Sequence, residues 1–302
     1  MGGRLAAWLI AASLGVAAAA PAAACSVCGC GDPLLSASDP AALNGRLRLQ
    51  LETEYLTIKA GNEFNPALTD KLDQYSLRLN AVYSPLDGLT LIGTVPFTRK
   101  DLSTSGVTGS DLSGLGDLEL GARYTLFDRP DFARQRRQSI AVSAGTSLPT
   151  GSNDATINGV RVDEHGQLGT GSWGPFAGVH YAFEQARWSM FASLSVRLRT
   201  TNAHDYRYGS ALLWSIHGQF WAVPRLALDL GIDARHAAAD TLLGAAVDST
   251  GGTVLAAAPG VYWNVAGPVW LSLRAQLPFY TSLFGNQSVG PTVVAGVQYV
   301  LF

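Results

Sequence analysis

The segment Trp188–Thr200, with the sequence WSMFASLSVRLRT, alternates strictly between apolar and polar side chains. An extended chain places alternate residues on opposite sides, so one face of this segment is apolar and the other carries serines and arginines. The run is long enough to cross a bilayer, which takes a tilted strand roughly 9–11 residues. Trp188 stands beside a very short turn, where membrane strands place interfacial aromatic residues. The segment therefore predicts one strand of a transmembrane β-barrel, with its apolar face toward lipid.

The N-terminus has the pattern of a secretory signal peptide, which we assign to residues 1–24. Arg4 precedes the apolar run Leu5–Ala20, and the small residues of Pro21–Ala24 provide a cleavage site before Cys25. The alternative to a signal peptide is a retained membrane-spanning helix, for which the run is short. No later segment has an uninterrupted apolar run long enough for such a helix. For an exported, membrane-like chain without spanning helices, the closed β-barrel is the remaining fold, because lipid requires every backbone polar group to be paired internally.

The composition agrees with this class. Of the 302 residues, 15% are charged and 47% are apolar, with 33 glycines and a net charge of -2. Low charge and high glycine content suit a β-rich membrane protein. A nucleic-acid-binding protein would need a basic patch, so the sequence predicts no nucleic-acid partner.

Further segments repeat the alternation along the chain. Short connections such as Ala222–Arg225 alternate with long loops, of which Pro149–Ser172 is the longest. Short periplasmic turns and long outer loops are typical of outer-membrane barrels. The sequence therefore predicts an all-β fold: a transmembrane antiparallel up-and-down β-barrel of about 12 strands over residues 45–302, with both termini in the periplasm. The expected strands are 46–55, 75–83, 89–97, 118–127, 139–148, 173–183, 188–200, 211–221, 226–236, 254–263, 269–280 and 292–302.

Polar residues fill the segments 59–72, 100–116 and 128–138, which predicts a loop or linker at each. Aromatic residues gather beside the short turns and predict an interfacial girdle at one rim. A soluble β-sandwich, the alternative fold, would also alternate, but it has no reason to place aromatic residues at one end of successive hairpins. The predicted girdle comprises Tyr83, Phe127, Phe183, Trp188, Trp221, Trp263 and Trp270.

The polar face of the predicted strands supplies candidate lumen-lining residues, among which arginine outnumbers the acidic residues. Two interpretations stay open. The side chains line a pore whose charge ring biases which solutes pass, or they pair across strands and close the lumen as a structural network. The candidates are Arg46, Arg48, Glu52, Glu54, Arg78, Glu119, Arg123, Arg197, Arg199, His217, Asp229, Asp233, Arg235 and Arg274.

All three cysteines, Cys25, Cys28 and Cys30, lie in a predicted periplasmic tail of residues 25–44. Three thiolates so close together could bind copper or zinc, although a structural zinc site needs a fourth ligand. In an oxidising periplasm two of them could form a disulfide and leave an odd thiol for a redox partner. Lipidation of Cys25 is the third alternative. Lipoprotein signals usually carry Leu at the position of Ala22, which argues against it.

The sequence favours a protein that is not an enzyme and has no cofactor, unless Cu or Zn binds at the cysteines. Ser215 and His217 share the inward face of one strand, but no Asn or Asp is placed to orient the imidazole. Four residues of the longest loop could bind a cation, although a solvated loop is the simpler interpretation; they are Asp154, Asp163, Glu164 and His165.

Four segments resemble a family of bacterial outer-membrane proteins named for the MetA pathway of phenol degradation, often described as transporters. They are SGLGDLELGARYTLF (Ser113–Phe127), PTGSND (Pro149–Asp154), GTGSWGPFAG (Gly169–Gly178) and SVRLRTTN (Ser195–Asn202). The resemblance covers most of the chain after the cysteine tail. It implies an outer-membrane barrel that passes or binds small compounds, aromatic or otherwise hydrophobic, and it identifies no catalytic or substrate-binding residue.

We therefore expect a Gram-negative outer-membrane channel or transporter-like protein for the passive passage of small solutes. Its expected partners are outer-membrane lipid and a small-molecule solute. The alternative is a barrel whose cysteine tail binds a thiophilic metal or a periplasmic redox partner, and an outer-membrane enzyme comes third.

Overall fold

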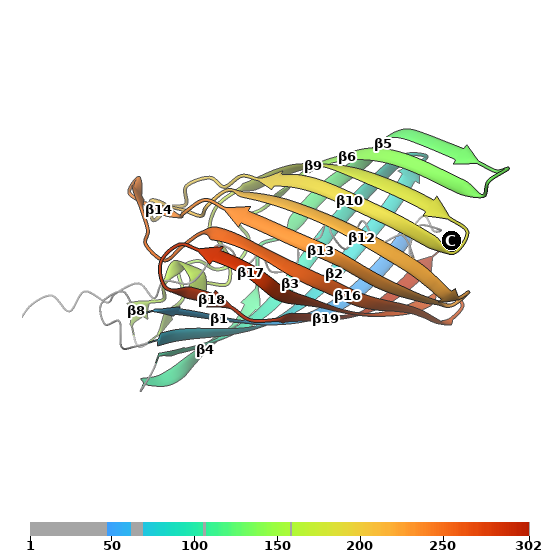
Figure 1. Cartoon of the computed structure of the whole chain (residues 1–302). Coiled ribbons are helices and arrows are strands. Elements are labelled where there is room, and N and C mark those ends of the chain that lie inside the picture. Colours follow the sequence, from blue (N-terminus) through green and yellow to red (C-terminus); the bar gives the residue numbers. More distant parts are fainter. Residues whose placement is uncertain (1–46, 62–68, 105–106, 158, 302) are drawn as a thin grey trace, which may run out of the picture.

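The computed structural model describes residues 47–61, 69–104, 107–157 and 159–301. In this part of the chain, 12 antiparallel strands form one closed barrel (Figure 1). The predicted up-and-down barrel of about 12 strands is thus confirmed. The barrel strands are β1 (Leu47–Gly61), β2 (Thr69–Leu86), β3 (Leu89–Thr104), β5 (Glu119–Asp131), β6 (Arg136–Ser147), β9 (Gly174–Gln185), β10 (Trp188–Arg197), β12 (Ala211–Val223), β13 (Leu226–Ala237), β16 (Gly252–Ala266), β17 (Val269–Leu283) and β19 (Thr292–Leu301).

The barrel closes because β1 pairs with two strands at once. On one side its register with β2 includes Leu47↔Tyr83. On the other side it pairs with the last strand, β19, from Leu47↔Leu301 to Tyr55↔Val293. Every barrel strand therefore has a hydrogen-bonded neighbour on each side, as the interior of a bilayer requires.

Successive strands are joined by tight turns at one end of the barrel, which we call the turn end. The short connections that the sequence predicts are confirmed there, and the longer loops lie at the opposite end, the loop end. Gly88, in the turn between β2 and β3, has a φ of 82°, a left-handed conformation that glycine adopts without strain. The tight turns are Asp87–Gly88, Ala186–Arg187, Pro224–Arg225 and Gly267–Pro268.

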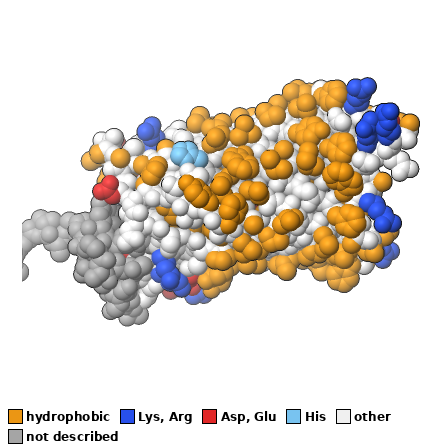
Figure 2. Space-filling view, viewed as in Figure 1, with side chains coloured by type: hydrophobic (Ala, Val, Ile, Leu, Met, Phe, Trp, Pro, Cys, Tyr) orange, Lys and Arg blue, Asp and Glu red, His pale blue; other side chains and the backbone are white. Residues whose placement is uncertain are grey.

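Strand β10 shows how the alternation is used. Leu194 and Val196 are exposed on the outer wall, whereas Ser195 and Arg197 are buried on the inner wall. On the face seen in Figure 2, apolar side chains cover the barrel between its ends, and Lys and Arg lie toward the ends. In lipid this apolar band takes the role that a buried core has in a soluble protein. The chain has the architecture of a transmembrane β-barrel.

Two segments predicted as a loop and a linker are strands instead. Residues 100–104 continue β3, and residues 107–115 form β4 (Val107–Leu115), which pairs with β3. Residues 128–138 form a hairpin in which Asp131 pairs with Arg136, and the exposed ion pair Arg137–Asp128, at 2.6 Å, stabilises it. Strands β1 and β2 likewise run into the predicted loop 59–72. Strands outside the lipid are solvated on both faces, so they lose the apolar alternation by which strands are recognised.

The aromatic girdle at the turn end is only partly as predicted. Tyr83, Trp188 and Trp263 are exposed on the outer wall, at the depth of the membrane interface. Trp221 and Trp270 instead lie on the inner wall, where their rings meet edge to face with centroids 6.0 Å apart. Trp221 shares the phase of the buried Gln219, and Trp270 shares that of Arg274, which reaches Glu52 inside the barrel. Neither tryptophan can therefore face lipid.

Short elements lie outside the barrel wall, in the loops or beside β1. No helix among the described residues is long and apolar enough to span a membrane. The short elements are β7 (Thr156–Ile157), β8 (Val160–Arg161), the 3-10 helix η2 (Glu164–Gly166), β11 (Tyr206–Arg207), β14 (Thr241–Leu242), β15 (Ala245–Ala246) and β18 (Gln287–Val289).

We expect depth in the membrane to decide the cost of a charge on the outer wall. Leu230, 66% exposed near the middle of β13, and Leu86, 68% exposed beside a tight turn, differ mainly in depth. Leu230→Arg should lower the free energy of unfolding by about 2–4 kcal/mol and Leu86→Arg by about 0–1 kcal/mol. Urea unfolding from phospholipid vesicles measures both, and equal losses would contradict the lipid-facing assignment.

Candidate functional site

Glu52 is the centre of a buried ion-pair network on the inner wall. Its side chain is 0% exposed and accepts hydrogen bonds from Gln50 and Asn80, both at 3.0 Å, and from Nη2 of Arg274 at 2.8 Å. Arg274 belongs to β17, which is separated from β1 by β19. Gly296 of β19 lies in the gap, where a Cβ atom would come 3.3 Å from Cγ of Glu52. The missing side chain lets the two charges meet across the intervening strand.

Arg78 and Glu54 extend this network. Nη2 of Arg78 donates to Oε2 of Glu54 at 3.0 Å, and its Nε lies 3.9 Å from Glu52. Four of the predicted lumen-lining residues, Glu52, Glu54, Arg78 and Arg274, thus form one cluster. Such buried pairs are costly to break, because the remaining partner becomes an uncompensated charge in a low dielectric.

His217 lies at the centre of a second cluster. Its Nδ1 is 2.7 Å from Asp229 and its Nε2 is 2.9 Å from Asp233, and Gln276 donates to Asp233 at 2.7 Å. The imidazole lies over Gly231, where a Cβ atom would come 2.4 Å from the ring. The prediction that no Asp orients His217 is therefore wrong, because β12 and β13 pair in a register that the sequence does not reveal.

Ser215 and His217 are hydrogen-bonded to other residues and not to each other. The hydroxyl of Ser215 is 2.7 Å from that of Ser193, and both ring nitrogens of His217 are bonded to carboxylates. A nucleophile and base need a direct hydrogen bond, and this pair lacks one.

A third cluster lies toward the loop end. Arg197 makes a two-point ion pair with Glu119, and its guanidinium carbon lies 5.2 Å from the centre of the Phe176 ring, in cation–π geometry. Arg199 donates to the hydroxyl of Ser147 at 3.0 Å. The remaining candidates Arg48, Arg123 and Arg235 also lie in the inner-wall phase of their strands. Arg46, the three cysteines, the predicted signal peptide (residues 1–24) and the cysteine tail (residues 25–44) fall outside the described residues.

An apolar layer crosses the lumen on the loop side of the Glu52 and His217 clusters. Its members come from β1 and β2 and from β12 and β13, which lie on opposite sides of the barrel. The sequence contains the signal for this layer, because Leu56 and Ile58 continue the inward phase of Glu52 and Glu54. The layer comprises Leu56, Ile58, Leu72, Ala211, Leu213 and Ala237, with Leu102, Val254, Leu283 and Val289 packed against it.

Residues 149–172, which we call the mouth loop, fold back over the loop end. Gln167, 1% exposed, donates to the carbonyls of Ala155 and Val162 and accepts from the Ala155 amide. Lys100 donates to the carbonyls of His165 and Gln167 at 2.7 and 2.5 Å. The expectation of a solvated loop is wrong for Glu164 and His165, which are buried, whereas Asp154 is exposed. In the buried part of the loop, side chains replace water as partners for the backbone.

His165 joins the mouth loop to the loop after β13. Its Nε2 is 2.7 Å from Oδ2 of Asp240 and 3.0 Å from the hydroxyl of Tyr206, which donates to Asp240 at 2.6 Å. Burial raises the pKa of Asp240, but hydrogen bonds from His165, Tyr206 and the Gly209 amide outweigh it and hold the pKa below its usual range. Burial, followed by nearby carboxylate charge, raises the pKa of Tyr206 and Tyr208 well above the ordinary 10.0.

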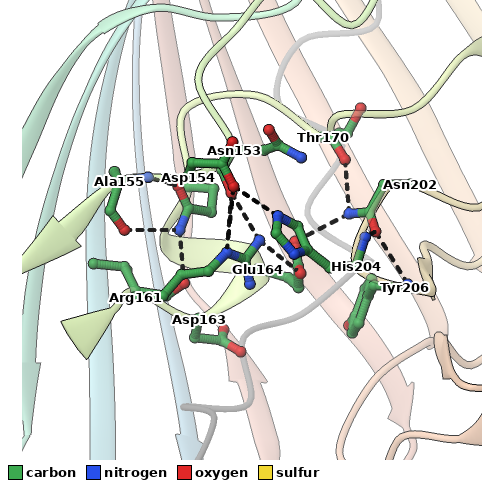
Figure 3. A network of polar contacts seen from close by, with 12 residues as sticks. Asn153, Asp154, Ala155, Arg161, Asp163, Glu164, Thr170, Asn202, His204 and Tyr206 are labelled. Atoms are coloured by element: carbon green, nitrogen blue, oxygen red, sulfur yellow. Dashed lines mark hydrogen bonds and ion pairs between the residues drawn. The ribbon is translucent and has the colours of Figure 1, made fainter.

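A second set of contacts joins the mouth loop to the loop after β10 (Figure 3). Arg161 pairs with Glu164 at 2.8 Å, and Asn202 donates to Glu164 at 3.2 Å. His204 lies 2.7 Å from Asp154. Among the residues that the structure describes, no group of three or more His, Cys, Asp or Glu is placed to hold a metal ion. The acidic residues of this loop hold it in place through cationic and amide partners.

We predict that Glu52→Gln lowers the free energy of unfolding by about 3 kcal/mol, because it leaves the charge of Arg274 buried without its carboxylate. Asp128→Asn is the control, since it breaks an exposed pair with Arg137 and should cost less than about 1 kcal/mol. Urea unfolding curves of the two variants measure the difference. Equal small losses would mean that the Glu52 network does not stabilise the barrel.

We also predict that alkali loosens the mouth loop. Tyr206 and Tyr208 have raised pKa values, so the stability they contribute is complete below pH 10 and is lost as the pH rises beyond it. Tyrosinate absorbance should show a late ionisation step that disappears in the double variant Tyr206→Phe, Tyr208→Phe. If the double variant keeps the late step unchanged, these tyrosines do not hold the loop.

Comparison with known proteins agrees with this architecture. The COG4313 outer membrane channel from Pseudomonas putida F1 is 17% identical, with a TM-score of 0.64 over 85% of this chain and 96% of that chain. The translocator domain of the autotransporter NalP from Neisseria meningitidis is 12% identical, with a TM-score of 0.50 over 89% of this chain and 93% of that chain. These likenesses show the outer-membrane barrel fold.

No curated protein sequence matches the chain. Residues 60–285, well over half of the chain, match the sequence profile of the family described as "Putative MetA-pathway of phenol degradation". This match confirms the resemblance found in the sequence motifs. The chain belongs to that family of outer-membrane β-barrel proteins.

Proposed function

We propose that the protein is a passive outer-membrane channel whose lumen favours small apolar or aromatic solutes over hydrophilic ones. The observation that carries the proposal is the apolar layer, which crosses the lumen between the buried ion pairs and the mouth loop. A hydrated solute must give up part of its water to pass such a constriction, in which Gln74 and Arg235 are the polar neighbours of Leu56 and Leu213. A small apolar solute leaves water at a gain in free energy.

The paired state of the inner-wall charges supports the same solute class. Arg274 is paired with Glu52, and His217 is paired with Asp229. These paired charges are poorly suited to replace the hydration shell of a charged solute. The description of the family, which refers to phenol degradation, and the name of the Pseudomonas putida barrel, an outer membrane channel, also support the proposal.

The proposal predicts that one polar substitution in the apolar layer makes the channel conduct better. Leu213→Ser places a hydroxyl in the layer, so water and ions should pass more easily and conductance in planar bilayers should rise several-fold. Leu212→Ser is the matched control, because Leu212 is the adjacent residue and is exposed on the outer wall. It should leave conductance unchanged, and an equal response of the two variants would contradict the proposal.

Solute preference is tested on the same bilayers by the block of ion current. Phenol should interrupt the wild-type current at lower concentration than glycerol, and Leu213→Ser should narrow the difference. If the two solutes act alike on the wild-type protein, the lumen does not select by polarity.

A further inference from the structure

The four sequence segments that carry the family resemblance meet at the base of the mouth loop. Asp117, from the first segment, accepts hydrogen bonds from the amide of Gly151 at 3.0 Å and from the amide and hydroxyl of Thr170 at 2.8 and 2.6 Å. Gly151 belongs to the second segment and Thr170 to the third. From the fourth segment, Asn202 donates to the carbonyl of Thr170 at 3.1 Å. One carboxylate beside β5 thus holds both ends of the mouth loop to the barrel wall.

Glycines let three stretches of backbone come together at this base. A Cβ atom on Gly151 would lie 2.7 Å from Cα of Gly169 and 3.0 Å from Cα of Gly116, which is too close for a larger residue to fit without a shift. The amide of Gly169 donates to the carbonyl of Ser152 at 2.8 Å and joins the two ends of the loop directly. The base of the mouth loop is therefore a tightly packed anchor.

The segment Asp163–Gln167, which we call the lid segment, lies inside the loop end of the barrel. Leu102 on β3 faces inward, because it packs against the apolar layer, and Lys100 shares its phase. The ammonium of Lys100 donates to two carbonyls of the lid segment, and a Cβ atom on Gly166 would lie 2.9 Å from Cδ1 of Leu102. The lid segment therefore rests on a residue that itself packs on the apolar layer.

The lid segment is also bound from the opposite side of the barrel. Nε2 of His165 contacts Oδ2 of Asp240, in the loop after β13, and the hydroxyl of Tyr206, in the loop after β10. Strands β3 and β13 face each other in the closed ring: β12, β10, β9, β6 and β5 lie between them on one side, and β16, β17, β19, β1 and β2 on the other. A segment bound to both sides lies across the opening of the lumen.

The two sets of contacts differ in how they can be released. At the base, Asp117 accepts from three donors among packed glycines. On the β13 side, a single imidazole nitrogen of His165 serves both Asp240 and Tyr206. Movement of one side chain therefore separates the lid segment from Asp240, while the base stays attached to the wall.

We propose that the lid segment is the gate of the channel, anchored through the base that Asp117 fixes and held shut by the contact of His165 with Asp240. Passage of a solute requires the lid segment to leave the lumen, because it lies across the path to the apolar layer. The anchored base keeps the loop beside the opening, so the gate closes when His165 returns to Asp240. The gate rests on the proposed function, since it controls entry to the same lumen.

Single-channel recording of the full chain in planar bilayers tests the gate. His165→Phe keeps an aromatic ring in place but removes the hydrogen bond to Asp240. The ratio of open to closed time should rise roughly tenfold, the effect of one lost hydrogen bond to a charged group. His236→Phe is the control, because His236 is exposed on the outer wall at the same end, and it should leave the ratio unchanged. An unchanged ratio in His165→Phe would overturn the proposal.

A metal bridge tests whether the closed lid segment blocks the lumen. Asp240→Cys places a thiol opposite Nε2 of His165, so that one Zn²⁺ ion can bind both. The background carries Cys25→Ser, Cys28→Ser and Cys30→Ser, so that no other thiol binds the metal. Zn²⁺ should reduce the current of this variant, and a chelator should restore it. The same protein with His165→Phe should not respond, and equal block of the two proteins would contradict the gate.

The anchor is tested through the same metal bridge. Asp117→Asn leaves one acceptor oxygen and turns an amide NH₂ group toward the donors of Gly151 or Thr170. Added to Asp240→Cys, it should raise the Zn²⁺ concentration for half block roughly tenfold, because the lid segment is no longer held beside position 240. Asp111→Asn, which removes an exposed carboxylate of β4, is the control. Equal block with and without Asp117→Asn would show that Asp117 does not anchor the gate.

The outcomes separate the gate from the channel proposal. If Leu213→Ser raises conductance but His165→Phe leaves the open ratio unchanged, the channel stands and the gate falls. If the gate responds as described but Leu213→Ser and Leu212→Ser conduct alike, the gate stands and the apolar layer is not the selective element. Folding of every variant is checked by heat-dependent migration in gels.

Discussion

The pairing of the first strand with the last is the interaction on which the rest of the protein depends. In lipid an unpaired strand edge has no water to satisfy it, so β1 must find β19 as well as β2. Once the ring is closed, every alternate residue is committed to the lumen. The inner wall then has to satisfy a dense set of polar and charged side chains without bulk solvent, and the functional features follow from how it does so.

Glycines on the inner wall make room for charged side chains to reach their partners. Gly296 lets Arg274 reach across a strand to Glu52, and Gly231 gives the imidazole of His217 a flat surface between Asp229 and Asp233. Side chains that lie along the wall pair with one another instead of projecting to the barrel axis. The lumen is consequently layered, from the tryptophan pair at the turn end, through the ion pairs and the apolar layer, to the mouth loop.

Much of this could be read from the sequence, and the failures have identifiable causes. Alternation gave the strand number and the inward phase of Glu52 and Arg197, because the lipid face must be apolar. It failed for residues 128–138, where both faces are solvated and the pattern fades. It misled for Trp221 and Trp270, since an aromatic residue beside a turn suits either wall and only strand phase decides.

The sequence by itself determined the class of protein, the barrel and the side of the wall on which most residues lie. These follow from a local period of two, which lipid on one face enforces. Only the tertiary structure decided which inward residues meet. His217 finds Asp229 and Asp233, Leu56 joins a layer with Leu213, and the mouth loop docks through His165 on Asp240. Such contacts depend on strand register and on closure across the barrel, and no local pattern encodes either.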